Sequence, residues 1–239
     1  MIRILHIYPE LLNLYGEYAN LSILTRYLRE EGAEVEITSL SLGEAIPAGY
    51  DMLYLGCGTE TASIRALKAL LPFRDTLLSY RDRGALILAT GNSLDLFGSG
   101  IEDDMLGDFQ GLNLFDFTVK RTHKTRYLGD AILTCELTSD RVIGFVNKCS
   151  LISGICSPLF HAEMGMGNDG VSQDEGLYDG NFFGTSLIGP LLIRNPSLCR
   201  LLMDRLYQTC QFSPTSKADM SLQEQAYSAA HGELSARLK

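Results

Sequence analysis

The sequence lacks the features that mark several large classes of protein. It has no excess of basic residues, since 20 Lys and Arg stand against 29 Asp and Glu, for a formal net charge of −9. A nucleic-acid backbone or an anionic membrane surface is therefore not an expected partner. No apolar run approaches the roughly 20 residues that a membrane-spanning helix needs, and residues 1–8 are too short and too strand-like for a signal peptide. We therefore expect a cytoplasmic protein without membrane insertion.

Cysteine is present, but not in the patterns that metal sites or disulfide frameworks use. The six cysteines are scattered along 239 residues and include no CxxC pair. In an intracellular chain such cysteines are reduced, and several are expected to be small core residues. Neither cysteine nor histidine falls at zinc-ligand spacing. The sequence thus predicts no metal and no other cofactor, and the acidic run Glu102, Asp103 and Asp104 is typical of a solvated face.

The order of apolar patterns predicts an α/β domain. Strand-like runs at residues 2–8, 34–38, 52–55 and 85–89 alternate with helical patterns at 19–31 and 63–80. Strands that alternate with helices imply a mostly parallel central sheet with right-handed crossovers. Residues from about 113 to 187 contain short β-prone pieces separated by glycines, which predicts a β-rich elaboration of the same domain.

The last part of the chain predicts two helices, at residues 196–212 and 221–238, with a break at residues 213–216. No Pro- or Ser-rich linker marks a domain boundary. We therefore expect residues 1–212 to form the domain, and residues 213–239 to form a linker and an amphipathic helix of that same domain.

The most informative segment, residues 85–98, has the form of a catalytic site without a catalyst. An apolar strand leads into a turn at Gly91 and Asn92, and the apolar residues 94–97 can begin a helix. Enzymes of the α/β class present a nucleophile at such a strand–turn–helix, where the helix N-terminus favours negative charge. Cys or Ser is typical at the turn, but this chain has Gly91 there.

A second loop, Gly56-Cys57-Gly58, follows the third predicted strand. In an open parallel sheet, ligands bind where strand C-termini meet loops, so we expect Gly91 to lie within about 10 Å of this loop. Bare backbone N–H groups in a glycine-rich loop can hold an oxyanion. Alternatively, the glycines only serve tight turns, and spacing alone does not separate the two interpretations.

Motifs along nearly the whole chain indicate a family. The most specific are the opening segment LHIYPELLNLYG at residues 5–16 and the late segment at residues 184–196, which contains GT, GPLL and NP. Shorter matches lie at residues 56–58, 127–130 and 143–147. On these motifs the chain resembles class I glutamine amidotransferases of the cobyric-acid-synthase type. Within that group it is most similar to the glutaminase subunits of lipid II isoglutaminyl synthase.

The resemblance implies a three-layer α/β fold and a two-subunit enzyme. In this family the glutaminase subunit hydrolyses glutamine with a Cys nucleophile and a His base. The ammonia then passes to a Mur-ligase-like synthetase subunit, which amidates the D-glutamate of the peptidoglycan precursor. The implied partner of this chain is therefore a Mur-ligase-like synthetase, in a heterodimer.

Both catalytic side chains of the family are absent from this chain. The family's elbow CGGYQLLG ends on residues 96–98, which places Gly91 at the nucleophile. The family's GTYLHGPLL places Ile188 at the His, between Thr185 and Gly189. A one-residue slip at the elbow would place Thr90 there, which is still not Cys. A glycine has no side chain to attack a carbonyl, so the sequence predicts no catalytic residues and no glutaminase activity.

Other residues could still bind a ligand. Gly56, Gly58 and Asn92 could line an anion or carboxylate site, and Arg126 matches a family Arg implicated in glutamine capture. Arg126 also lies in a basic loop at residues 120–126, where it could simply be solvated. Two alternatives stay open: an active amidohydrolase with a relocated nucleophile such as Cys57, and a sensor that binds glutamine or another small amino acid in the old pocket.

Overall fold

The computed structural model describes residues 1–238, and a six-stranded sheet forms its centre. The strand order is β13-β14-β4-β3-β1-β2, and every neighbouring pair is parallel except β13 with β14. The strands of this sheet are β1 (Ile2–Ile7), β2 (Val35–Leu40), β3 (Met52–Leu55), β4 (Leu86–Thr90), β13 (Leu177–Asp179) and β14 (Phe182–Thr185). The four predicted strands are confirmed to within two residues at each end.

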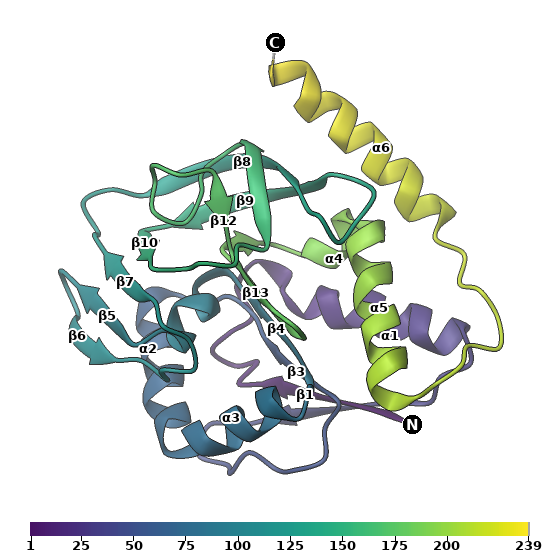
Figure 1. The fold of residues 1–239 in the computed structure, drawn as a ribbon, viewed down its shortest axis with the longest axis horizontal. Helices are drawn as coiled ribbons and strands as arrows, with labels where there is room; N and C mark the ends of the chain where they lie inside the picture. Colours follow the sequence, from purple (N-terminus) through teal and green to yellow (C-terminus); the bar gives the residue numbers. More distant parts are fainter. Residues whose placement is uncertain (239) are drawn as a thin grey trace.

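Helices cover both faces of the central sheet and make three layers (Figure 1). The helices are α1 (Tyr18–Glu30), α2 (Glu60–Leu70), α3 (Arg74–Asp82), α4 (Leu191–Arg194), α5 (Pro196–Cys210) and α6 (Ser221–Ser235), with the 3-10 helices η1 (Leu14–Gly16), η2 (Leu71–Phe73), η3 (Gly91–Phe97) and η4 (Ala236–Leu238). One apolar core joins α1, α4 and α5 to one face of the sheet, and a second joins α2 and α3 to the other. The predicted fold class is confirmed.

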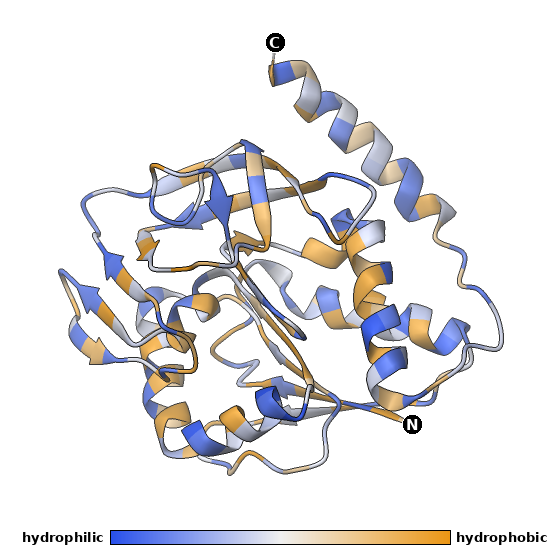
Figure 2. Cartoon of the chain, in the orientation of Figure 1, coloured by the Kyte–Doolittle hydropathy of each residue, from blue (hydrophilic) through white to orange (hydrophobic). Residues whose placement is uncertain are grey.

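The local sequence explains why the central strands were recognisable. All residues of β3 and β4 are buried, because a parallel strand in the middle of a doubly covered sheet has no solvent face. The sequence of such a strand is therefore a continuous run of apolar residues. Figure 2 shows these hydrophobic strands in the middle of the sheet. Helix α1 instead buries Leu21, Leu24 and Leu28 at helical spacing and exposes its other face.

Two smaller sheets form the predicted β-rich part. One has the order β10-β7-β5-β6, and the other has the order β12-β11-β8-β9-β15. Their strands are β5 (Gly100–Asp103), β6 (Gly107–Gln110), β7 (Thr118–Arg121), β8 (Tyr127–Thr134), β9 (Val142–Lys148), β10 (Ser150–Ser153), β11 (Phe160–Met164), β12 (Asp174–Glu175) and β15 (Leu187–Ile188). The sheet of β8 and β9 packs on the core of α1 and α5, whereas β5, β7 and β10 pack on the core of α2.

The C-terminal helix α6 extends away from the body (Figure 1), and hydrogen bonds from two of its side chains hold it there. Gln223, its one buried residue, donates from Nε2 to the carbonyls of Leu192 and Ile193. Tyr227 donates its hydroxyl to the carbonyl of Arg141. The sequence predicted an amphipathic helix, but Leu222 is 77% exposed, because the apolar residues of α6 do not gather on one stripe. None of the helices formed by residues 1–238 has the length and apolar character to cross a membrane.

Candidate functional site

The predicted elbow lies where the C-terminal ends of three parallel strands meet. The pairs Leu55 with Ala89 and Thr90 with Thr185 bring the ends of β3, β4 and β14 side by side. Gly91 follows β4 with a φ of +61°, a left-handed conformation that suits glycine. The sharp turn at Gly91 therefore exists, but the expected α-helix after it is the short 3-10 helix η3.

The space beside Gly91 is filled by the side chains of Cys57 and Ile188. A Cβ atom built on Gly91 would lie 2.6 Å from both the Cβ and the Sγ of Cys57, and 2.9 Å from the Cγ2 of Ile188. Carbon atoms in contact prefer separations of about 3.5–4.0 Å. Gly91 and Ile188 thus face each other, as a nucleophile and its base would, while the Cys57 side chain occupies the volume that a nucleophile would need.

The residues at this point offer no acid–base pair. Ile188 is 4% exposed and presents only hydrocarbon. Cys57 is 3% exposed, and its thiol donates toward the carbonyl of Gly58 and the Oδ1 of Asn92. Burial raises the pKa of the Cys57 thiol to about 12, so the reactive thiolate is scarce near neutral pH.

His6 at the end of β1 does not supply the missing base. Its ring packs against Tyr54 with the ring centroids 5.2 Å apart. Burial lowers the pKa of His6 to about 4, and its Nε2 has no hydrogen-bond partner among the described residues. No hydrogen bond joins His6 to Cys57 within residues 1–238, which agrees with a structural role for this histidine.

The glycines of the loop between β3 and α2 serve close packing of the backbone. A Cβ on Gly56 would lie 2.8 Å from the Cβ of Glu17, and one on Gly58 would lie 2.5 Å from the carbonyl oxygen of Leu11. The Gly58 N–H donates to Asn92 Oδ1 at 3.1 Å, and Asn92 Nδ2 donates to the Gly58 carbonyl at 2.8 Å. An oxyanion at Gly58 would therefore have to displace the Asn92 amide.

A buried carboxylate, Glu17, lies directly beneath the elbow and was missed by the sequence reasoning. Its Oε2 accepts hydrogen bonds from Thr90 (2.5 Å), Tyr54 (2.8 Å) and Asn20 (3.2 Å). Its Oε1 accepts the N–H of Gly189 at 2.8 Å. Burial raises the pKa of Glu17 to about 7, against the opposing effect of these hydrogen bonds. The signal in the sequence was an acidic residue directly after the matched opening segment.

The raised pKa of Glu17 predicts a loss of stability with rising pH. The folded chain holds this proton up to about pH 7, whereas an unfolded Glu releases it near 4.5. The contribution is complete below pH 4.5 and is lost as the pH rises to 7, with a total of about 3 kcal/mol. We expect Glu17→Gln, measured by urea unfolding at several pH values, to flatten this slope. Exposed Glu34→Gln is the control, and equal slopes for Glu17→Gln and the parent would contradict the prediction.

Arg126 lies next to the glycine loop but already has a carboxylate partner. Its guanidinium donates to Glu60 Oε1 at 2.5 Å and to Asn147 Oδ1 at 2.8 Å, and Asn147 in turn donates to the Tyr15 hydroxyl. Burial alone would raise the pKa of Glu60, but its hydrogen bonds and the positive charge of Arg126 together outweigh burial, and the pKa is lowered. The incoming α-carboxylate of an amino acid would compete with Glu60 for Arg126.

The structure corrects the interpretation of the acidic run after η3. Asp103 is buried, at 4% exposure, whereas Glu102 and Asp104 are exposed. The backbone N–H groups of Met105 and Leu106 donate to the Asp103 carboxylate, so the turn before β6 holds this side chain inward.

A second buried carboxylate that the sequence did not predict is Asp95 of η3, which pairs with Arg121 at 2.8 Å.

The chain is similar in sequence to a known protein family and to two characterised subunits. A family model for the CobB/CobQ-like glutamine amidotransferase domain matches residues 3–196. Over 206 residues the chain is 26% identical to the GatD subunit of lipid II isoglutaminyl synthase (glutamine-hydrolyzing) from Streptococcus pneumoniae, covering 84% of this chain and 79% of the relative. It is 24% identical over 206 residues to the GatD subunit from Staphylococcus aureus, covering 85% of this chain and 84% of the relative.

Among solved structures, a chain of PurLQS from Thermotoga maritima has a similar fold. The TM-score is 0.58 at 14% sequence identity, with 88% of this chain and 97% of that chain covered. At this level of identity the similarity supports the fold and not the activity.

Proposed function

The chain belongs to the CobB/CobQ-like glutamine amidotransferase family, and from this we propose that it acts as the amidotransferase-fold subunit of a two-subunit amidating enzyme without hydrolysing glutamine itself. The chemistry of the family needs a thiolate and a base at the elbow. This chain has Gly91 and Ile188 at the matching positions. The chain therefore keeps the fold of the family but not its glutamine chemistry.

The observation that carries the proposal is the filled space beside Gly91. Cys57 and Ile188 both reach the point where the Cβ of a nucleophile would lie. A simple loss of the Cys side chain would leave a cavity, and a cavity in a packed core is destabilising. Instead, the neighbours of Gly91 close the gap, which is the arrangement expected of a site that is packed for stability and no longer holds a reactive group.

The polar groups around the elbow support the same conclusion. The Asn92 side chain satisfies the N–H and the carbonyl of Gly58, and Glu60 pairs with Arg126. Binding energy for glutamine would first have to replace these internal contacts. The same contacts weigh against an amino-acid sensor in the old pocket, because its two best binding groups are already engaged.

The named relatives suggest the partner and the pathway step. Both are subunits of lipid II isoglutaminyl synthase, so we propose that this chain binds a Mur-ligase-like synthetase that amidates the D-glutamate of a peptidoglycan precursor. An interface depends on surface shape and on its rim residues rather than on a nucleophile. A fold that has lost its catalytic side chains can therefore keep this role.

Association with a synthetase is the direct test of this proposal. We expect the two proteins, when co-expressed, to elute together in size-exclusion chromatography at micromolar concentration. We also expect the amidation of precursor with added ammonium to change when this chain is present, with the synthetase alone as the control. Separate elution, together with an unchanged rate of ammonium-dependent amidation, would contradict the proposal.

A further inference from the structure

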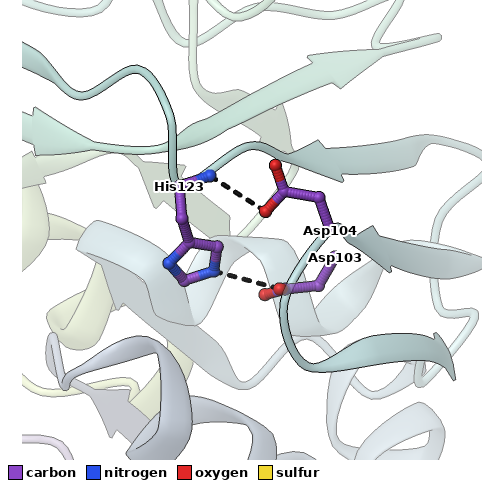
Figure 3. A group of neighbouring side chains, drawn as sticks. All are labelled: Asp103, Asp104 and His123. Carbon is purple, nitrogen blue, oxygen red and sulfur yellow. Dashed lines mark hydrogen bonds and ion pairs between the residues drawn. The ribbon is translucent and has the colours of Figure 1, made fainter.

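A cluster of one histidine and two aspartates lies at the end of the sheet formed by β5, β6, β7 and β10. β5 ends at Asp103, which pairs with Arg121 at the end of the parallel strand β7. The chain beyond β7 then brings His123 over the turn that holds Asp103 and Asp104 (Figure 3). One potential ligand atom from each of the three residues lies within 4.8 Å of the others.

The two carboxylates are held in place by surrounding donors. Asp103 Oδ1 accepts the backbone N–H groups of Met105 and Leu106 at 3.0 and 2.9 Å. Asp104 accepts the Thr122 hydroxyl at 3.0 Å and the His123 N–H at 3.0 Å. These hydrogen bonds fix both carboxylates in place. An ion that binds here would therefore not have to order the two aspartate side chains.

A second feature of Asp103 supports a cation site. Its Oδ2 is buried and has no hydrogen-bond partner among the described residues. A buried carboxylate oxygen without a donor is costly, and a bound cation would satisfy it.

His123 can also act as a metal ligand. Its Nε2 lies 3.0 Å from Asp103 Oδ1, which is the distance of a hydrogen bond. An ion would replace this hydrogen bond after a small shift, since two ligand atoms of a tetrahedral Zn²⁺ with bonds of about 2.1 Å lie about 3.4 Å apart. Because the imidazole is a nitrogen donor, the set favours Zn²⁺ or a similar transition-metal ion over Mg²⁺ and Ca²⁺.

We propose that Asp103, Asp104 and His123 bind a divalent transition-metal ion, with Zn²⁺ as the best-matched ion. The ion would join the turn between β5 and β6 to the loop that continues to Arg126, and water would complete its coordination. The role is structural, and it holds whether or not the chain associates with a synthetase. Cys–His spacing did not predict it, because the ligands come from two loops that the fold brings together.

Direct binding of Zn²⁺ to the full-length chain tests the site. We would titrate Zn²⁺ by calorimetry under reducing conditions in a Cys156→Ser background, because Cys156 is the exposed cysteine. We expect one ion per chain at micromolar affinity and no saturable binding of Mg²⁺. His123→Ala and Asp104→Asn should each weaken Zn²⁺ binding by about tenfold or more.

The chain offers a matched control at a second His–Asp pair. His161 lies 3.2 Å from Asp174, but both side chains are more than half exposed and no third ligand completes a cluster within residues 1–238. His161→Ala should leave the affinity for Zn²⁺ unchanged. The proposal is overturned if Zn²⁺ does not bind, or if it binds His123→Ala and Asp104→Asn as tightly as His161→Ala. Thermal unfolding of the metal-free variants verifies that each one folds.

Discussion

The purified chain, alone or with a synthetase partner, should release no glutamate from glutamine above the rate of a protein-free control. The reason is that Gly91 provides no nucleophile and Ile188 provides no base. In the serine protease subtilisin, removal of the nucleophile lowers kcat on the order of 10⁶-fold and leaves only the effects of binding and of the oxyanion site. The measurement is a coupled glutamate assay under conditions in which an active amidotransferase turns over.

Cys57 provides the control for this prediction. Its raised pKa and buried thiol lead us to expect that a glutamine-analogue electrophile leaves Cys57 unmodified near neutral pH. Clear glutamate release that disappears in Cys57→Ala would refute the prediction, and would establish the relocated-nucleophile alternative. Release that survives in Cys57→Ala would point instead to a contaminating glutaminase, which purification of that variant can reveal.

Replacing Gly91 with Cys should destabilise the fold by about 2–5 kcal/mol. A Cβ at this position would overlap the Cβ and Sγ of Cys57 at 2.6 Å, and overpacking in a core typically costs about 1–3 kcal/mol. A side chain at the φ of +61° adds backbone strain of about 1–2 kcal/mol. The free energy of unfolding in urea, for the parent and the variant, measures the sum of the two effects.

Two further variants separate steric overlap from backbone strain. Gly180 has the same φ of +61° but open space around it, so Gly180→Cys should show the backbone strain alone. In a Cys57→Gly background, Gly91→Cys should cost at least about 1 kcal/mol less than in the parent, because the overlapping side chain is gone. If Gly91→Cys cost the same in both backgrounds, Cys57 would not be filling the nucleophile's space.

The amino-acid sequence by itself determined the elements and the family. β3 and β4 are buried on both faces, so they appear as continuous apolar runs, and the helices between them show their own periodicity. These signals come from residues close together in the chain. The motifs at residues 5–16 and 184–196 added the family, and with it the prediction that Gly91 and Ile188 stand where the family has its Cys and His.

The tertiary structure alone decided what surrounds those positions. Cys57 and Asn92 meet across 35 residues of chain, and Glu17 reaches Gly189 across 172 residues. The burial of Asp103 and its approach to His123 likewise depend on how β5 and β7 pair. Local periodicity carries no information about such contacts, because each one forms only after the sheets close and bring separate loops to a common edge.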